Sequence, residues 1–362
     1  MAVPATTGQM RTRLEDMEIG DYIPCSYKGS GTDAGSLYAL GDPNKVEIVD
    51  PAVNIDGMFY FIKVARGKLI ADRCVRTAIS WNNLNLSGWM DGAKVSNVAR
   101  GKTVTASSTY SDSGGTASAS ALVNGSTTIG GYSGWWAPSN GDKNPWVKID
   151  LEYTYNVNKF RVYFGAATDK VVVKVSTNNI DFIPVATILN SKAADTWEEV
   201  TIETPAPARY VMFDGATVDN SYGYNVMRLY EVEVMAADQF PESARVRLPT
   251  GGVGYMGEHN TVVAEDTTYL GYGAFPSNNE WDTLVVGFPP DKIQEGMTLD
   301  NVFDVSTFRT LTTDVLAKGI THPHVYRVTR GGTLNRPHWV AFIASGSRSS
   351  LTGVRPLIEY EE

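Results

Sequence analysis

The sequence of 362 residues predicts an all-β protein divided into three β-rich domains. Short runs of alternating apolar and polar residues recur along it, among them KVEIV, KVVVKVS, LYEVEVM and TLVVGF. Clusters of Gly, Asn, Asp and Ser separate these runs, and long amphipathic helical patterns are nearly absent. Such spacing is typical of β-sandwiches and barrels. The hydrophobic content of 43% supplies a core for each domain.

Two stretches mark the expected domain boundaries. The first is the Gly- and Ser-containing segment from Ser87 to Ser96. The second is AADQFPES, residues 236–243, where a strand pattern stops and a proline follows. The predicted domains are residues 1–95, 96–236 and 237–362.

Charge and composition exclude several classes of protein. The net charge is −9, from 31 Lys and Arg against 40 Asp and Glu, and no segment is basic, which argues against a nucleic-acid groove. The N-terminus has no apolar signal-peptide core, and no stretch is long enough to span a bilayer, so we expect neither export by the usual route nor membrane insertion. Cys25 and Cys74 are too few for a disulfide framework. We expect buried free thiols, with a single bridge as the alternative.

The first domain is expected to be compact and rich in β strands. One short helical turn is predicted near Leu14 to Met17, and Trp81 is expected to be buried. In the third domain, the block NNEWD predicts a turn followed by a strand, with Trp281 buried. The final GVRPLIEYEE predicts a last strand in the sheet.

The stretch NPWVKIDLEYTYNVNKFRVYFG, residues 144–165, predicts two half-buried strands. Apolar side chains occupy every second position in each: Val147, Ile149 and Leu151, then Phe160, Val162 and Phe164. We expect Trp136 and Trp146 to pack in the core, because aromatic residues dominate core burial.

Four blocks in the middle of the chain carry a resemblance to a known family. They are SNVARGKTVTASS at 96–108, ALVNGS at 121–126, GWWAPSNGDKNPWVKIDL at 134–151 and MRLYEVEVM at 227–235. In this order and spacing they resemble the discoidin or coagulation-factor C-type domain, also known as a galactose-binding-like carbohydrate-binding module. The resemblance implies a jelly-roll β-sandwich whose loops at one end hold the ligand, often with a structural calcium nearby.

The same resemblance implies a calcium site. It places the calcium loop on Leu122 to Thr127 and the late acidic ligand on Glu231, so the implied metal residues are Leu122, Asn124, Thr127 and Glu231. Calcium takes six to eight oxygen ligands. The family commonly has Asp where this chain has Asn124, which removes one negative charge but keeps an oxygen ligand. The alternative is a simple β-turn at Asn124-Gly125.

Sugar binding generally requires an exposed aromatic face together with amide, carboxylate or guanidinium groups. The loop DNSYGYN, residues 219–225, and the earlier loops supply such side chains. The glycan-binding candidates are Tyr110, Tyr132, Asn220, Tyr222, Tyr224 and Asn225. Packing of Tyr222 or Tyr224 against neighbouring loops is the alternative. The loops are polar and poor in Lys and Arg, which disfavours binding to a lipid surface.

The flanking segments carry a second resemblance. Residues 12–27 and 57–85 are similar to the N-terminal region of virion-associated proteins encoded among tail genes of phages and prophages of Gram-positive bacteria. Proteins of this kind end in a similar NNEWD block and a similar EY terminus. The resemblance implies docking onto a larger particle.

The sequence gives no sign of an enzyme. It contains no HExxH, no GxSxG and no glycine loop that would cradle a phosphate. Its four histidines lie in the last third, and His322 and His324 are expected in an exposed loop, with a metal role as the alternative. Spacing alone leaves open a pair of glycosidase carboxylates on distant strands, but three small β domains contain no recognisable catalytic barrel.

The leading hypothesis is a phage virion protein, tail-associated or fibre-like, that binds host cell-surface glycans through its central domain. We expect a homo-oligomer in contact with other virion proteins, in which several weak sites act together. One alternative is a structural protein that decorates the capsid or cements the tail and whose central domain has no ligand. Another is a free secreted carbohydrate-binding protein, which the missing signal peptide disfavours.

Overall fold

The computed structural model shows a chain made mostly of β strands, which confirms the all-β prediction. It describes residues 3–29, 34–52, 56–127, 131–139, 141–165, 170–189, 195–215, 227–237, 239–257, 261–263, 273–317, 325–332 and 336–362. Among these residues, no helix has the length and apolar character needed to cross a membrane. Cys25 and Cys74 are free and buried, as predicted, and burial raises the pKa of both thiols.

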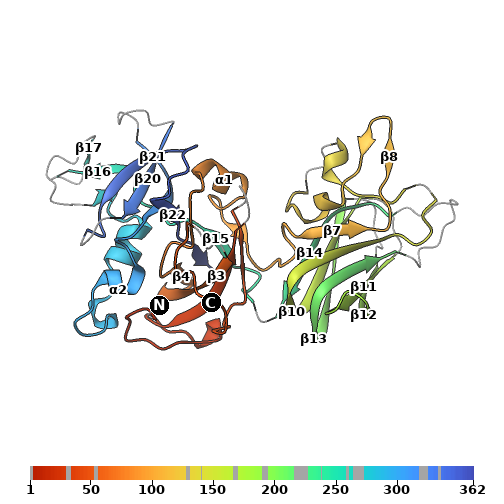
Figure 1. Ribbon diagram of the computed structural model, residues 1–362, viewed down its shortest axis with the longest axis horizontal. Helices are drawn as coiled ribbons and strands as arrows, with labels where there is room; N and C mark the ends of the chain where they lie inside the picture. Colours follow the sequence, from red (N-terminus) through yellow and green to blue (C-terminus); the bar gives the residue numbers. More distant parts are fainter. Residues whose placement is uncertain are drawn as a thin grey trace. The chain divides into compact units, whose positions relative to one another are not determined.

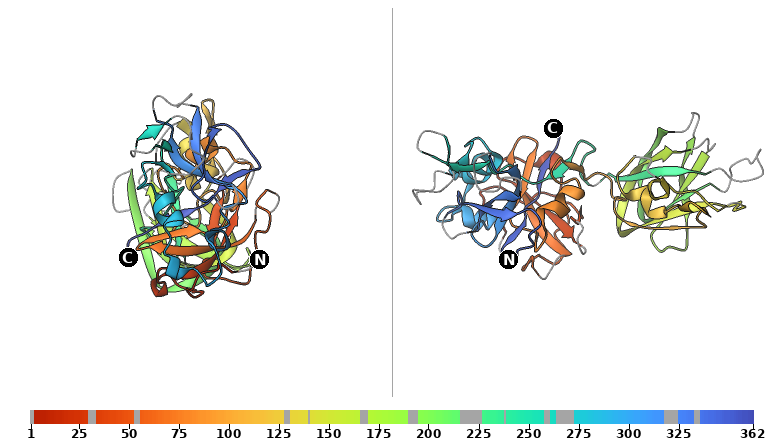
Figure 2. Two further views of the ribbon diagram at one scale, coloured as in Figure 1. Left: turned by 90° about the vertical axis from the view of Figure 1, so that its left-hand side faces the viewer. Right: turned by 90° about the horizontal axis from the view of Figure 1, so that it is seen from above.

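The chain forms two compact units (Figure 1). Met1–Val95 and Ser243–Glu362 together make unit 1, and Ser96–Glu242 make unit 2. Three successive domains were predicted, but the first and third segments fold together and the middle one is inserted between them. Both chain ends lie in unit 1 (Figure 2).

A sheet of seven described strands joins the two halves of unit 1. Its order is β2 (Ser36–Tyr38), β1 (Tyr22–Lys28), β3 (Asp56–Ala65), β4 (Lys68–Ala71), β23 (Leu357–Glu359), β15 (Arg245–Arg247) and β6 (Ala93–Lys94). The last strand, β23, lies between β4 from the first segment and β15 from the third. β15 also pairs with β6, which immediately precedes the insertion. The predicted final strand is therefore present, and it completes the N-terminal sheet.

Two further sheets complete unit 1. One consists of β21 (Val340–Ala344), β20 (Tyr326–Gly331), β19 (Arg309–Val315), β22 (Thr352–Val354) and β5 (Arg76–Thr77). The other consists of β17 (Val262–Val263), β16 (Gly254–Met256) and β18 (Ala274–Phe275). The described helical segments are η1 (Leu14–Asp16), α1 (Trp81–Leu86), η4 (Trp281–Val286), η5 (Pro290–Lys292) and α2 (Leu299–Phe303). The predicted helical turn near Leu14 corresponds to η1.

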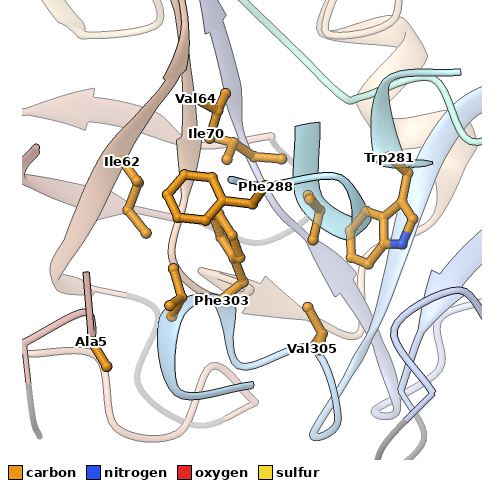
Figure 3. Close-up of a cluster of buried hydrophobic side chains, with 10 residues drawn as sticks. Ala5, Ile62, Val64, Ile70, Trp281, Phe288, Phe303 and Val305 are labelled. Carbon is orange, nitrogen blue, oxygen red and sulfur yellow. The ribbon is translucent and has the colours of Figure 1, made fainter. Parts of the chain in front are cut away.

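A shared hydrophobic core explains why the first and third segments form one unit (Figure 3). Ile62 and Ile70 from the first segment pack with Trp281, Phe288 and Phe303 from the third. All five side chains are at most 3% exposed. Separating the segments would return this apolar surface to water.

Trp281 is buried as predicted, but the strand expected after the NNEWD turn is absent. Residues Trp281–Val286 form the π-helical turn η4 instead. Asn279 explains the difference, because its side-chain oxygen accepts a hydrogen bond from the Asp282 amide at 3.0 Å. Its main-chain carbonyl accepts from the Thr283 hydroxyl at 2.9 Å. These local bonds start a helical turn.

Trp81 was expected to be buried but is half-buried at the first position of α1. Ser80 caps this helix by accepting a hydrogen bond from the Asn83 amide. The Trp81 indole donates to the Thr312 carbonyl at 3.0 Å, and the Arg327 guanidinium lies 4.2 Å from the ring centroid. The ring therefore packs under a cation at the surface.

Two fully buried guanidinium groups link the loops of unit 1. Arg330 donates to the Gly251 carbonyl at 2.9 Å and pairs with the Asp282 carboxylate. Arg355 donates to the carbonyls of Ala71 at 2.8 Å and Asp304 at 3.1 Å. Because a buried cation without partners is very costly, these bonds fix the chain segments that provide the acceptors.

Unit 2 is a β-sandwich built on two strands of 19 residues, β10 (Trp146–Phe164) and β13 (Thr196–Asp214). The other strands of its sheet are β7 (Thr103–Ala106), β11 (Lys170–Ser176), β12 (Ile183–Leu189) and β14 (Leu229–Ala236). A register shift between Asp150 and Tyr155 divides β10, and Glu152 adopts a positive φ of 69° there. The first half pairs with β7 and the second with β14, so one strand serves both layers.

The inward positions of β10 are those the sequence predicted. Val147, Ile149, Leu151, Phe160, Val162 and Phe164 are all fully buried. Two separate strands were expected, but the bulge keeps them in one continuous strand. Trp136 is fully buried as predicted. Trp146 is not part of the core, because it alternates with buried Val147 and lies half-buried on the outer face.

The ion pairs of unit 1 predict an acid-sensitive stability. Burial opposes ionisation of Glu280, but hydrogen bonds from Arg247 and Lys68 outweigh it and lower its pKa to about 2. A lowered pKa contributes stability that is fully present above the ordinary value of 4.5 and is lost as the pH falls toward 2. We expect Glu280→Gln to lower the free energy of unfolding of unit 1 at pH 6 by up to about 3 kcal/mol, and to flatten the fall of its unfolding temperature toward pH 3.

Calorimetry would measure this, with the transition of unit 2 as an internal reference. Glu295→Gln removes an exposed carboxylate that has no ion pair among the described residues and is the matched control. Equal acid slopes for wild type and Glu280→Gln would contradict the assignment.

Candidate functional site

The loops between β7 and β10 gather three aromatic rings. They contain the hairpin of β8 (Ser111–Asp112) and β9 (Gly115–Thr116), which stands at one end of unit 2, and the turns η2 (Ala119–Val123) and η3 (Gly131–Gly134) (Figure 1). The Trp135 ring centroid lies 6.0 Å from that of Tyr110 and 5.4 Å from that of Tyr132. The structure thus brings the two predicted tyrosines together around a tryptophan that was not predicted. We call Tyr110, Tyr132 and Trp135 the ring cluster.

Trp135 reaches this position because its neighbour is fixed in the core. Trp136 exchanges two backbone hydrogen bonds of 2.9 Å with Leu229, and its indole donates to the Ser108 carbonyl at 3.1 Å. Adjacent side chains on an extended segment point to opposite sides, so Trp135 faces outward when Trp136 faces inward. The GWW triplet already carries this alternation, although the sequence predicts a place only for its second tryptophan, Trp136.

A single carboxylate orients both tyrosines. The Tyr132 hydroxyl donates to the two oxygens of Asp112 at 2.6 and 2.7 Å, and the Tyr110 hydroxyl donates at 3.0 Å. The Gly114 amide also donates to Asp112, at 2.8 Å. The hydrogen bond from Tyr132 is the main reason that the pKa of Asp112 is lowered, and the same bond raises the pKa of Tyr132 to about 12. At neutral pH the site therefore combines an ionised acid with two protonated phenols.

The hairpin of β8 and β9 requires glycine at position 115, where the Tyr132 ring packs against it. A Cβ atom on Gly115 would lie 2.7 Å from a ring carbon of Tyr132, and the φ of Gly115 is +152°. Gly115 therefore allows both the turn and the close approach of the ring.

Arg228 adds a positive charge to the ring cluster. Its guanidinium lies 4.6 Å from the Trp135 ring centroid, and its side chain is exposed. The site thus presents aromatic faces, a carboxylate and a guanidinium within one group of loops. These are the groups that contact the C–H faces and hydroxyls of sugars.

Four predicted glycan-binding residues are not placed by the structure. Asn220, Tyr222, Tyr224 and Asn225 lie outside the described residues. Arg228, which follows this segment, was not among the predicted site residues.

The implied calcium residues occupy a separate loop. Leu122 is buried in η2, whereas Asn124 and Thr127 are exposed. Glu231 on β14 is 1% exposed, and one of its carboxylate oxygens accepts a hydrogen bond from the Gly125 amide at 3.0 Å. The structure therefore brings Glu231 to the Asn124-Gly125 turn.

The other carboxylate oxygen of Glu231 is buried and has no hydrogen-bond partner among the described residues. Burial, reinforced by the nearby charge of Glu233, raises the pKa of Glu231 to about 9, although the Gly125 amide opposes the shift. Such an orphaned oxygen fits a cation, which would replace the proton. The Asn124 side-chain oxygen already accepts from the Ser126 amide at 2.7 Å, and the Arg100 guanidinium lies against Gly125. No group of three His, Cys, Asp or Glu side chains converges in the described part of the chain.

Comparison with known proteins agrees with this architecture. Residues 103–229 match the F5/8 type C domain family. The inserted unit contains an F5/8 type C domain. No curated protein matches the chain.

Several solved structures resemble the domain. Chitosan-binding module 1 of a chitosanase/glucanase from Paenibacillus sp. IK-5 is 25% identical, and the match covers 39% of this chain and 98% of that one, with a TM-score of 0.32. The lectin domain of lectinolysin, solved with Lewis B antigen, is 26% identical over 40% of this chain and 99% of that one, with a TM-score of 0.30. A fucose-binding module of Streptococcus pneumoniae is 20% identical over 39% and 94%, with a TM-score of 0.29.

The bond between Tyr132 and Asp112 in the F5/8 type C domain can be tested directly. Because Asp112 is the main cause of the raised pKa of Tyr132, we expect Asp112→Asn to lower that pKa from about 12 toward 10. A pH titration of the protein with ¹³C-labelled tyrosine would measure the change by NMR, and Tyr132→Phe would assign the resonance. A Tyr132 that titrates near 10 in the wild type would show that the bond does not form.

Proposed function

We propose that the F5/8 type C domain binds glycans through the ring cluster, with Asp112 and Arg228 as the polar groups. The observation that supports this proposal is the convergence of Tyr110, Tyr132 and Trp135 on one carboxylate at the loop end of the domain. Rings held by both stacking and hydrogen bonds are pre-organised, which reduces the entropy lost when a ligand binds. A ligand sugar would stack on these rings and donate hydroxyl hydrogen bonds to Asp112.

We also propose that the protein belongs to a phage virion and that unit 1 docks the domain onto the particle. The support is the resemblance of the flanking segments to virion-associated proteins, together with their folding as one unit. In such a particle, several copies would engage a host surface at once and turn weak single sites into stable attachment.

The glycan proposal predicts a specific loss of binding. The full-length protein would be applied to glycan arrays and to purified cell walls of Gram-positive bacteria. We expect Trp135→Ala to lower affinity at least roughly tenfold, about 1.4 kcal/mol, because the central ring of the cluster is lost.

Trp197→Ala is the matched control, because Trp197 is also half-buried in unit 2 but lies outside the ring cluster. Its ring centroid lies 5.2 Å from that of Tyr163. Unchanged binding by Trp135→Ala would remove the ring cluster from the function. Absence of binding by the folded wild type to every surface would favour the alternative of a structural virion protein without a ligand.

We further propose that calcium binds beside Glu231, with Leu122, Asn124 and Thr127 supplying the other oxygens. The support is the orphaned oxygen of Glu231 and the implied calcium loop. Bound there, the ion would hold the loop to β14, while Asn124 and Gly125 keep their turn.

This proposal predicts that a rising pH destabilises the metal-free protein and strengthens the stabilisation by calcium. Without metal, a raised pKa contributes stability that is present below the ordinary value of 4.5 and lost as the pH rises toward 9. We therefore expect the unfolding temperature of unit 2 in chelator to fall from pH 5 to pH 9, and Glu231→Gln to remove this slope. Calcium is expected to raise the unfolding temperature of the wild type more at pH 8.5 than at pH 6, because it must displace a proton. An equal calcium effect on Glu231→Gln would place the ion elsewhere.

A further inference from the structure

The layer of unit 2 that contains β7, β11 and the first half of β10 carries aromatic and basic side chains on its outer face, and the ring cluster does not use them. Outward positions of β10, β13 and β11 hold Trp146 and Lys148, Tyr210 and Met212, and Lys174. All of these side chains are half-buried. A sheet face turned to solvent is normally polar, so partly exposed rings and a thioether on it indicate a contact surface.

Lys148 is the centre of this surface. Its ammonium lies 5.6 Å from the Trp146 ring centroid and 6.0 Å from that of Phe182, and it donates to the Asn179 side-chain oxygen at 2.7 Å. We call Trp146, Lys148, Asn179 and Phe182 the Trp146 patch. It joins β10 to the turn between β11 and β12.

The neighbouring charges on this face are already neutralised. Lys174 pairs with Asp214, and Arg209 pairs with Asp150 at 3.0 Å. Lys148 differs from both, because no carboxylate of the described residues lies within 4 Å of its ammonium. Its described partners are two rings and one amide, none of which carries a negative charge. The patch therefore presents a net positive charge between two aromatic side chains.

This combination matches one class of ligand. An aromatic ring accepts the C–H face of a pyranose, and a lysine without a carboxylate partner favours an anionic group on the same ligand. A neutral sugar would leave the ammonium unused, and a purely ionic polymer would leave the rings unused. The low basic content of the whole chain argues against nucleic acid.

We propose that the Trp146 patch is a second binding site, distinct from the ring cluster, for an acidic sugar residue that bears a carboxylate or a phosphate. The sugar ring packs on Trp146 and Phe182, and its anionic group pairs with Lys148. Binding at the Trp146 patch is independent of whether the ring cluster binds a ligand. It would let the domain hold a polyanionic glycan along its sheet face.

The test uses the full-length protein and two anionic probes in affinity electrophoresis. Polygalacturonate carries carboxylates on its sugar rings and phosphomannan carries phosphates on its sugars, so the pair separates the two sources of charge. Dextran is the neutral probe. We expect retardation of the wild type by at least one anionic polymer, and weaker retardation at higher salt.

Variants then assign the site. Lys148→Gln is expected to weaken binding to the anionic polymer roughly tenfold, Lys148→Arg to restore most of it, and Trp146→Ala to weaken it. Lys170→Gln removes the same charge from β11 outside the patch and is the matched control. Trp135→Ala is expected to leave this binding unchanged, so failure at the ring cluster and failure at the patch are distinguishable.

Three results would overturn the proposal. The first is binding of neither anionic polymer by the folded wild type. The second is equal weakening by Lys148→Gln and Lys170→Gln, which would show only the effect of net charge. If Trp146→Ala lowered the unfolding temperature of unit 2 without changing retardation, the patch would be a surface cluster that stabilises the turn, and the proposal would also fail.

Discussion

The pairing of β23 with both β4 and β15 is the constraint on which the arrangement of the chain depends. Three residues at the C-terminal end fill a gap in a sheet whose other strands come largely from the first hundred residues. This pairing holds β15 beside β6, so the two points where the chain leaves and re-enters unit 1 are fixed as neighbours. An inserted domain whose ends meet such neighbouring strands can fold without distorting its host.

Buried arginine side chains strengthen the link that β23 makes between the two segments of unit 1. Arg355 in the final segment takes its acceptors from Ala71, Asp304 and Thr310, so one cation fixes two distant parts of the chain. Arg330 does the same for the loops that contain Gly251 and Asp282. Guanidinium groups suit this role, because their several donors lie in one rigid plane and each can satisfy a different carbonyl. Trp281 packs in the hydrophobic core that the two segments share.

In unit 2 the corresponding constraint is the length of β10 and β13. Because each strand runs through both layers, the bulge at Glu152 sets where one layer ends and the next begins. The loops before β10 are fixed at their ends by the core, through Trp136 and the pairing of β7. Short side-chain hydrogen bonds then order the loop interior, with Asp112 and Asp142 as the acceptors. Rigid loops on a rigid sheet are the usual basis of a binding site.

The outward residues of the sandwich show that solvent-facing positions are not interchangeable. The charges of Lys174 and Asp214 neutralise each other in an ion pair. The Lys148 ammonium instead contacts two aromatic rings and one side-chain amide. The difference arises from the register between β10 and β13, which places Met212 and not a carboxylate opposite Lys148.

The sequence by itself determined the strand content, the inward faces of β10, the burial of Trp136 and Trp281 and the location of the F5/8 type C domain. Alternation and local blocks of residues carry that information, because it depends on neighbours within a few positions. It could not decide that the first and third segments share one sheet, since pairing of residues some 290 positions apart leaves no local pattern. It also assigned Trp146 and Trp81 to the core. Residue type alone does not distinguish an aromatic ring that faces the core from one that packs against a cation at the surface. Only the tertiary structure placed Trp135 between two tyrosines and left one oxygen of Glu231 unpaired, because these are distances between side chains brought together by the completed sandwich.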